Sequence, residues 1–399
     1  MYDVMQGIRV VEVAEHTFVP AASMILADWG ADVIKIERPS GDASRHLKLP
    51  MIEKDSINPF FECGNRGKRS VALDLNRPEG RALLYKIIES ADVFVTNMRE
   101  DARKKLGIES DDLLKINPRL IYARGTGFGI RGAMSSTGGF DFPSSWCRSG
   151  AGFMQTMPGG EPVGQPGSVG DLCGGATLAG AIAAALFRRE RTGKGAVVDN
   201  ALYLVGTWIM GQSIVGASVG FKPPIYPRGE YFDALMTMYR TSDNRWLSLC
   251  LLMPQWWPDF ARHIDRTDLL DDPRFSTQQA RLENSKALIG VLEAVFAQHT
   301  LSDWIDRLQT LEGVWSPLLS PEEVTRDPQA LENGFVTPIA THDGGSYLGA
   351  ASPAQFDGKP IGALKAAPLF AHDTEAVMRE LGIGDSEMET LRATGIIVG

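Results

Sequence analysis

Alternating strand-like and helix-like patterns fill the first 125 residues of the chain. Short β-branched runs at 8–13 and 32–37 flank a segment that opens with Pro20 and ends at Gly30, as helices do. Apolar residues at helical spacing in 78–91 lead into the strand-like stretch 92–97, and "RLIYARGTG" follows a further helical pattern. This repetition predicts an α/β fold with a mostly parallel sheet and right-handed crossovers.

Parallel sheets bind ligands at the carboxyl ends of their strands. The candidate loops are therefore those that follow Val13, Glu37, Val95 and Arg124.

The middle of the chain has a different pattern. "MTMYRTSDNRWLSLCLL" predicts an antiparallel hairpin that turns at 242–244, and helical segments follow at 255–264, 281–299 and 302–311, the last capped by Ser302. Prolines flank this part on both sides. We predict a large domain built from 1–205 and 330–399, a smaller α+β domain at 225–325, and linkers at 206–224 and 326–329.

Composition and charge narrow the function classes. The net charge of −9 argues against a general nucleic-acid or membrane-surface binder, so an anionic ligand would need a local basic patch. Four scattered cysteines show neither CxxC pairing nor metal-ligand spacing, which suits a reducing compartment. The N-terminal residues lack a signal-peptide pattern, and the uncharged apolar run 172–187 is shorter than the ~20 residues of a spanning helix. We expect a soluble cytoplasmic protein without metal, nucleic-acid or membrane partners.

Familiar motifs are missing. The sequence contains no GxxxxGK[ST], GxSxG or HExxH. "GTGFGIRG" (125–132) differs from a dinucleotide fingerprint in the position of its third glycine, and no helical pattern follows it. We interpret it as a loop after a strand.

Asp171 precedes a long run of small apolar residues in "GSVGDLCGGATLAGAIAAALFRRERTGKG" (167–195). Local pattern alone favours an N-cap aspartate on a tightly packed helix. The alternative is a carboxylate nucleophile, which must remain ionised although burial raises a carboxyl pKa by up to ~3–5 units. A helix dipole offers only about 0.3–1 kcal/mol in compensation, so backbone N–H donors are needed, and Gly174 and Gly175 are candidates for that role and for an oxyanion.

An ordered set of segments resembles the family III CoA-transferases, which include formyl-CoA transferase, carnitine CoA-transferase and 2-methylacyl-CoA racemase. The matching segments are "GIRVVEVAEHTFVPAASMILADWGADVIKIERPSGDASR", "NRGKRSVALDLNRPEG", "ADVFVTNMREDARKKLG", "INPRLIYARGTGFG", "RRERTGKGAVVD", "DPRFSTQQARLENSKAL" and "TEAVMRELGIGDSEMETLRATGII". The resemblance implies a doubly wound, Rossmann-like large domain with an inserted small domain, in a homodimer of interlocked ring-like subunits.

The family's nucleophilic aspartate falls at Asp171. By resemblance, its carboxylate attacks an acyl-CoA thioester, passes through a mixed anhydride and an aspartyl-CoA thioester, and hands CoA to an acceptor carboxylic acid. Coenzyme A is thus a substrate, and no metal is implied. The family's CoA contacts fall at Glu15, His16, Thr17, Phe18, Arg38, Leu73, Asn97, Met98 and Lys105. Arg38, Arg45 and Lys105 would form the basic patch.

Two departures from the family bear on the chemistry. The racemase branch has Gly-His-Asp before the nucleophile, whereas this chain reads "GGFDF", with Phe140 at the histidine position and Asp141 retained. Phenylalanine cannot carry a proton, which favours transfer over racemisation; simple core packing is the plainer explanation of Phe140. The oxalate-using branch has a glycine run where this chain reads "KPPIYPRGEYFDA", which disfavours oxalate and formate.

Three functions remain open on the sequence alone. A CoA-transferase is the first, a racemase-like enzyme with an unusual base the second, and a non-enzymatic acyl-CoA-binding protein the third. The sequence does not indicate which carboxylic acids serve as CoA donor and acceptor. A set of aromatic residues either lines an apolar acyl pocket or belongs to the core and interfaces; its members are Phe140, Phe142, Trp146, Phe153, Trp208, Trp256 and Trp257.

Overall fold

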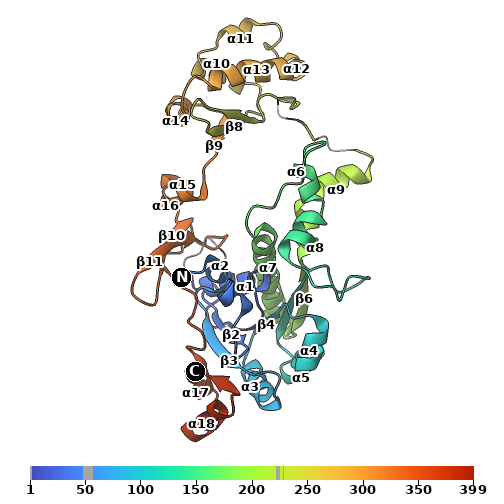
Figure 1. Cartoon of the computed structure of the whole chain (residues 1–399), viewed down its shortest axis with the longest axis vertical. Helices are drawn as coiled ribbons and strands as arrows, with labels where there is room; N and C mark the ends of the chain where they lie inside the picture. The colour runs from blue at the N-terminus through green and yellow to red at the C-terminus, as the bar shows by residue number, and fades with distance from the viewer. Residues whose placement is uncertain (1, 48–56, 222–224, 228) are drawn as a thin grey trace. The chain divides into compact units, whose positions relative to one another are not determined.

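The structure is a computed structural model that describes residues 2–47, 57–221, 225–227 and 229–399. The chain divides into two compact units (Figure 1). The first unit comprises Met1–Met154, Val163–Lys222 and Pro328–Gly399, and the second comprises Gln155–Pro162 and Pro223–Asp327. The predicted small domain, 225–325, lies within the second unit.

A seven-stranded sheet organises the first unit, as far as the described residues show. Its strand order is β13-β3-β2-β1-β4-β5-β6, and every neighbouring pair is parallel except β13 with β3. The strands are β1 (Arg9–Val13), β2 (Asp32–Glu37), β3 (Arg69–Leu73), β4 (Val93–Thr96), β5 (Ile121–Thr126), β6 (Ala196–Ala201) and β13 (Ile397–Val398). The predicted mixed α/β fold with a mostly parallel sheet is confirmed.

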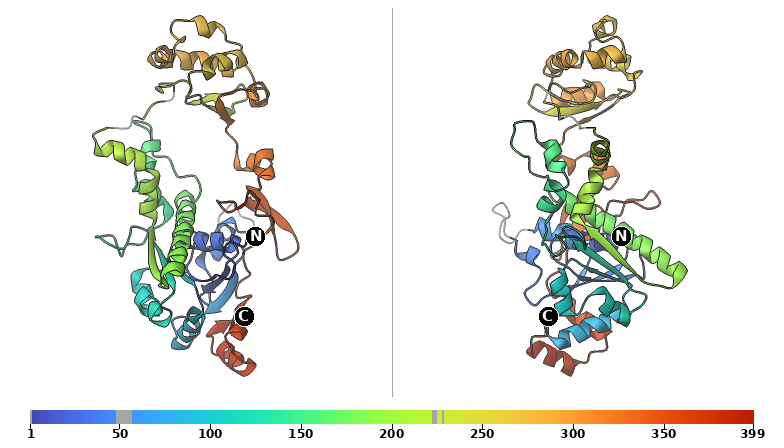
Figure 2. Two further views of the ribbon diagram at one scale, coloured as in Figure 1. Left: turned by 180° about the vertical axis from the view of Figure 1, so that it is seen from behind. Right: turned by 90° about the vertical axis from the view of Figure 1, so that its right-hand side faces the viewer.

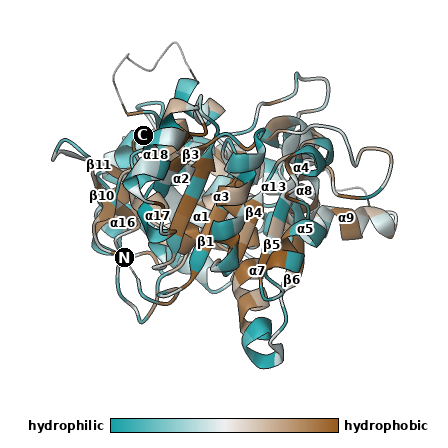
Figure 3. Ribbon diagram, turned by 90° about the horizontal axis from the view of Figure 1, so that it is seen from below, coloured by the Kyte–Doolittle hydropathy of each residue, from teal (hydrophilic) through white to brown (hydrophobic). Residues whose placement is uncertain are grey.

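Strands β1 to β4 are buried on both faces, which explains their richness in β-branched apolar residues, whereas the edge strand β6 is partly exposed. Neighbouring residues of β1 enter different core clusters, Val10 with α1 (Phe18–Asp28) and α7 (Val169–Thr192), and Val11 with α3 (Pro78–Glu89) and α17 (Thr374–Glu380). Figure 3 shows the apolar strands β1 and β4 lying among these helices. The strand-like repeats of the sequence therefore form the central sheet, and the helical repeats form a layer on each of its faces.

The remaining elements of the first unit are short. A second sheet pairs β10 (Val336–Ala340) with β11 (Ser346–Ala350) and β12 (Leu364–Lys365). The other helical segments are η1 (Ala43–His46), α2 (Pro59–Asn65), α4 (Glu100–Leu106), α5 (Ser110–Ile116), the π-helix η2 (Phe142–Cys147), α6 (Ala151–Gln155), α8 (Leu202–Ile209), α9 (Gly211–Ser218), α16 (Pro328–Glu332) and α18 (Asp385–Ala393).

Helix α7 begins at the residue after Ser168 and ends before Gly193, a left-handed residue that stops the helix. By length and hydropathy it is the one helix among the described residues that is able to cross a membrane. Its buried face instead packs against α1, beside which it lies in Figures 1 and 2. Small residues allow this close approach: a Cβ on Gly175 would lie 2.6 Å from that of Ala21.

The second unit combines a three-stranded antiparallel sheet with helices. The sheet order is β7 (Met238–Arg240), β8 (Trp246–Cys250), β9 (Val314–Pro317). Its core contains Trp257, Phe260, Phe296 and Trp304. The helices are α10 (Trp256–His263), α11 (Asp268–Asp271), α12 (Gln278–Glu283), α13 (Ser285–Phe296), α14 (Leu301–Leu308) and α15 (Pro321–Val324).

Two local expectations differ from the structure. Thr300, not Ser302, caps α14, because its side chain accepts from the Asp303 N–H and the Asp303 carboxylate accepts from the Thr300 N–H. The segment predicted as a linker, 206–224, is largely helical, since α8 and α9 extend to Ser218; its last residues, 222–224, lie outside the described residues. Four residues of "KPPIYPRGEYFDA", the stretch at the place of the family's glycine run, lie outside them: 222–224 and 228.

Candidate active site

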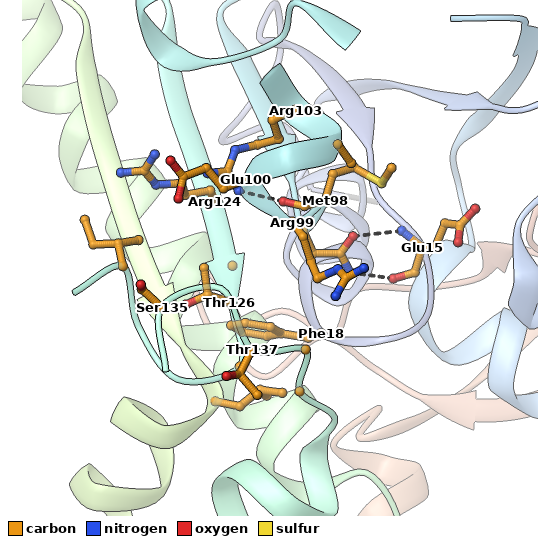
Figure 4. A pocket seen from close by; sticks show the side chains of 18 of the residues that line it. Glu15, Phe18, Met98, Arg99, Glu100, Arg103, Arg124, Thr126, Ser135 and Thr137 are labelled. Carbon is orange, nitrogen blue, oxygen red and sulfur yellow. Dashed lines mark hydrogen bonds between the residues drawn. The ribbon is translucent and has the colours of Figure 1, made fainter. Parts of the chain in front are cut away.

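The strand order reverses at β1, where β2 lies on one side and β4 on the other. The loops that follow β1 and β4 therefore separate at this point, and open α/β sheets bind ligands there. A cavity of about 870 Å³ opens at this edge of the sheet. Figure 4 shows side chains from α4, β5 and the loop after β5 around it, among them Arg99, Arg124, Thr126 and Thr137.

The loop after β1 reaches this cavity with Glu15, His16 and Phe18. Asn97, after β4, holds the loop by two hydrogen bonds: its Oδ1 accepts from the Glu15 N–H at 3.1 Å and its Nδ2 donates to the Glu15 carbonyl at 2.6 Å (Figure 4). Thr17 is buried at the start of α1 and is absent from the cavity lining. Asn97 thus fixes the loop in addition to lining the cavity.

A buried ionic network supports the same loop. Lys35 Nζ lies 2.7 Å from carboxylate oxygens of both Glu12 and Asp42, and Lys68 Nζ lies 2.6 Å from Glu12. Burial raises the pKa of Asp42, but the Lys35 charge together with hydrogen bonds from Lys35 and Ser44 outweighs it, and the pKa falls to about 2. The ionised Asp42 accepts from the His16 N–H at 3.4 Å. The network therefore holds His16 in a left-handed conformation, φ 65°, that a non-glycine residue seldom adopts.

A smaller cavity of about 260 Å³ adjoins the same loop. Arg38, Leu73 and Lys105 line it, and Glu15 and Met98 line both cavities. The structure thus brings the predicted CoA contacts together around two neighbouring cavities, with Thr17 as the exception. Arg45 does not belong to the basic patch: it forms an ion pair with Glu37 at 2.7 Å and donates to the Pro368 carbonyl.

Asp171 lies in the first turn of α7, three residues after the N-cap Ser168, and lines the large cavity. It is therefore not the N-cap that local pattern favours. Its N–H donates to the carboxylate of Asp141 at 3.1 Å. Ser145 Oγ donates to the other Asp141 oxygen, and a side chain on Gly170 would collide with both groups. Gly170 is thus required for Asp141 to reach the helix.

The electrostatic environment of Asp171 is unfavourable to its charge. Burial, with the negative charge of Asp141 adding to it, raises the pKa of Asp171 to about 7. Among the described residues, no side chain or backbone N–H donates to its carboxylate, and no cation pairs with it. The ionised carboxylate is consequently poorly stabilised by its surroundings.

The expected role of Gly174 and Gly175 as N–H donors is wrong. Both residues lie inside α7, where N–H groups donate to carbonyls of the preceding turn. Both are buried against α1, because Cβ atoms there would meet Phe18 and Ala21 at 2.5 and 2.6 Å. They are packing residues that let α1 and α7 meet.

Phe140 is 63% exposed, so core packing does not explain it. Its ring lines the cavity and contacts the His16 ring edge-on, with centroids 5.3 Å apart. None of the other aromatic residues singled out in the sequence lines the large cavity, and Trp257 lies in the core of the second unit. Of that set, Phe140 alone therefore contributes to the large cavity, where Phe18 is a second aromatic lining residue.

The loop between β5 and η2, a candidate because it follows a parallel strand, forms part of the site, although of its residues only Phe140 and Asp141 were predicted individually. Gly127, Ile130, Ser135, Thr137 and Gly138 line the large cavity, so "GTGFGIRG" is more than a connecting loop. The position of this loop after a parallel strand was a usable signal. Arg99, at the start of α4, was missed as well. No group of three potential metal ligands occurs among the described residues.

Comparisons with known proteins place these features in a family context. The family model described as CoA-transferase family III matches residues 5–374. The (R)-2-hydroxy-4-methylpentanoate CoA-transferase of Clostridioides difficile is 29% identical over 98% of this chain and 99% of its own. The succinate–glutarate CoA-transferase of Agrobacterium fabrum is 29% identical over 94% and 95%. The crystal structure of a CaiB/BaiF family protein from Brucella suis superposes with a TM-score of 0.81, at 28% identity and coverage of 94% and 99%.

Proposed function

We propose that this chain, which belongs to CoA-transferase family III, carries CoA from an acyl-CoA thioester to a carboxylic acid on the carboxylate of Asp171. The family relationship establishes a CoA-transferase that uses acyl-CoA and carboxylic acids. The covalent role of Asp171 is our proposal. The relatives act on different acids, which leaves the acids of this enzyme to experiment.

The isolation of the Asp171 carboxylate is the observation that carries the proposal. The other carboxylates of the large cavity are stabilised by partners or by water: Glu15 pairs with Arg38, Glu100 with Lys104 and Glu109 with Arg103, while Asp111 is exposed. A carboxylate paired with a cation is a weaker nucleophile. Asp171, with a pKa of about 7, combines basicity with a substantial ionised fraction at neutral pH.

The chemistry proceeds in four acyl-transfer steps. Asp171 Oδ attacks the thioester carbonyl carbon; a C–O bond forms, the C–S bond breaks, and CoA leaves as thiolate. The thiolate attacks the aspartyl carbonyl of the mixed anhydride, which releases the donor acid and leaves an aspartyl-CoA thioester. The acceptor carboxylate displaces the thiolate to form a second anhydride. The thiolate then attacks the acceptor's carbonyl and regenerates Asp171.

Asp141 positions the nucleophile in this scheme. Its bond to the Asp171 N–H fixes the first turn of α7, and its charge keeps the Asp171 pKa high. The two cavities accommodate CoA: Arg38 and Lys105 supply positive charge in the small one, and Glu15, His16, Asn97 and Met98 form the path toward Asp171.

A second candidate activity, α-proton exchange, has one observation in its favour. His16 lines the cavity that contains Asp171, so a histidine is present although Phe140 occupies the family's position for it. Exchange would place deuterium at the α-carbon of an acyl-CoA in deuterated water without any acceptor acid. Absence of label would exclude it.

The exposed apolar surface supports a homodimer. Trp208 is 83% exposed, and Leu204, Val215 and Val219 on or beside α8 and α9 are more than half exposed. A patch of this kind is typical of an interface between subunits. The partner would then cover α8 and α9.

A transfer assay tests the proposal. Purified enzyme is given a panel of donors that includes 2-hydroxyacyl, dicarboxylic and fatty acyl-CoAs, with paired acceptor acids, and the new acyl-CoA is measured by mass. D171N and D171A should each lose transfer by at least about a thousandfold. Retention of near-native transfer by both variants would refute the nucleophile.

A further inference from the structure

Glu15 occupies the point at which the two cavities meet. Glu15, Met98 and Ala102 line both of them. In Figure 4 the Glu15 side chain extends away from the Thr126 and Thr137 side of the large cavity. The small cavity in turn contains Arg38 and Lys105. A carboxylate therefore stands on the path that a polyanionic ligand would occupy.

This carboxylate forms an ion pair with Arg38, the arginine that lines the small cavity. Glu15 Oε1 lies 3.2 Å from Arg38 Nε, which also donates to the Gly41 carbonyl at 3.0 Å. The side chains of Arg38 and Glu15 are 54% and 29% exposed. An ion pair this exposed to water is weak, so Arg38 can leave Glu15 and bind the anion of a ligand instead.

The surroundings of Glu15 disfavour its charge when Arg38 is removed. Burial raises the pKa of Glu15, and the negative charge of Asp42 adds to it, whereas Arg38 acts in the opposite direction. Displacement of Glu15 from Arg38 by another anion therefore has an electrostatic cost. That cost would be subtracted from the affinity of the incoming anion.

We infer that Glu15 is an internal counter-ion that competes with the phosphate groups of CoA for Arg38 and so weakens CoA binding. The inference rests on the proposed function, because it assumes that CoA occupies these cavities. A transferase must release the product thioester in each cycle, and a resident carboxylate that returns to Arg38 favours that release. Glu15 thus tunes the affinity for CoA and the release of the product thioester, and it takes no part in making or breaking bonds.

Calorimetric titration of CoA into the purified enzyme tests the inference. Glu15→Gln should lower the Kd of CoA by about fivefold and make it rise more steeply with salt, because one anion no longer opposes binding. Glu15→Asp keeps the charge and should retain the wild-type salt dependence. It also separates charge from side-chain volume if Glu15→Gln perturbs the loop.

Glu79→Gln is the matched control. Glu79 pairs with Arg77 at 3.5 Å, is exposed, and lines neither cavity, so its loss removes one ion-paired carboxylate, as Glu15→Gln does, without touching the cavities. Its Kd should equal that of the wild type. An unchanged or raised Kd in Glu15→Gln, with normal CoA binding by the wild type, would overturn the inference and leave the proposed function intact. A wild-type enzyme that binds no CoA would overturn both.

Discussion

In the function that we propose, the chemistry depends on the carboxyl groups of Asp171 and Asp141. Two acids share one end of α7, one held by hydrogen bonds and the other left without a donor among the described residues. In our proposal, their different surroundings give two like side chains different roles: Asp141 positions the helix, and Asp171 is the nucleophile. The pKa of about 7 at Asp171 is a consequence, and it leads to three predictions at this scale.

Activity should depend on the ionisation of Asp171. Because only the carboxylate attacks a thioester, kcat/KM should rise with pH and level off above about 7. Initial rates at donor concentrations below KM, with the acceptor saturating, measure this across the pH range. A profile flat from pH 5 to 8 would be inconsistent with Asp171 as the titrating nucleophile.

The D141N variant should shift the rising part of this pH profile, its acidic limb, to lower pH. The amide oxygen of the new side chain can still accept from the Asp171 N–H, but the negative charge that helps to raise the pKa of Asp171 is gone, so the limb should shift below 7. The control E387Q removes an exposed carboxylate on α18 and should leave the limb in place. A shift of the limb to higher pH in D141N would contradict this account of the pair.

The active-site carboxyl should reduce the stability of the fold. The pKa of Asp171 is about 7 when folded, against an ordinary value of 3.8, so the folded state holds the proton more tightly and loses stability as pH rises from about 4 to 7. D171N removes this cost. It should raise the free energy of unfolding by on the order of 2 kcal/mol at pH 8, and by less at pH 5. Denaturant titrations at both values measure it; equal gains at both would disprove the linkage.

At the scale of elements, the approach of α1 to α7 determines the geometry of the site. Thr17 and Phe18 begin α1 directly after the loop that lines both cavities, and Asp171 lies in the first turn of α7, so the packing of the two helices sets the distance between loop and nucleophile. Gly174 and Gly175 make that contact possible. They are packing residues, as the tightly packed helix favoured by local pattern implies, and not the N–H donors that the alternative interpretation made of them.

Glycine substitutions along α7 should separate packing from helix propensity. Gly175→Ala places a methyl 2.6 Å from Ala21 Cβ and should destabilise the protein by about 1–3 kcal/mol, with lower activity. Gly180→Ala lies on the same helix with no neighbour within 4 Å and should stabilise it by about 0.5–1 kcal/mol. Thermal melts of both variants measure these changes in stability. A Gly175→Ala variant as stable as the wild type would mean that α1 and α7 are not tightly packed.

Local sequence patterns predicted the strands of the large sheet well. Asp32–Glu37 was predicted with the bounds that β2 has, because buried parallel strands are apolar runs bounded by charge and turns. Less was predictable where tertiary contacts decide. Arg45 was assigned to the ligand by its charge but pairs with Glu37. The loop after β5 was a candidate, but the particular side chains in it that line the cavity, such as Ile130 and Ser135, were not predicted. Contacts of this kind depend on how the folded elements meet, so spacing alone could not reveal them.

At the scale of the whole molecule, the family relationship covers most of the chain, and nearly all of the parallel sheet, with its cavities, lies within the matched residues. The apolar surface of α8 and α9 is the feature that one subunit leaves unexplained. Helix α8 follows β6 directly, and the exposure of Trp208, Val215 and Val219 on or beside α8 and α9 is typical of residues that a second subunit covers.

The wild type should therefore be a dimer in solution, as measured by light scattering after size exclusion. W208E introduces a charge on α8 and should shift the protein toward monomer. L331E, on the exposed side of α16, is a comparable change elsewhere and should remain dimeric. A monomeric wild type would refute the proposed interface.

Capture of the covalent intermediate is the most direct test of the central claim. Enzyme incubated with a competent acyl-CoA is quenched with hydroxylamine, digested, and analysed by mass spectrometry for the peptide that contains residue 171. We predict a hydroxamate at Asp171 that appears only with acyl-CoA and is absent from D171N. An unmodified Asp171 in an enzyme that is still transferring CoA between acids would contradict the account.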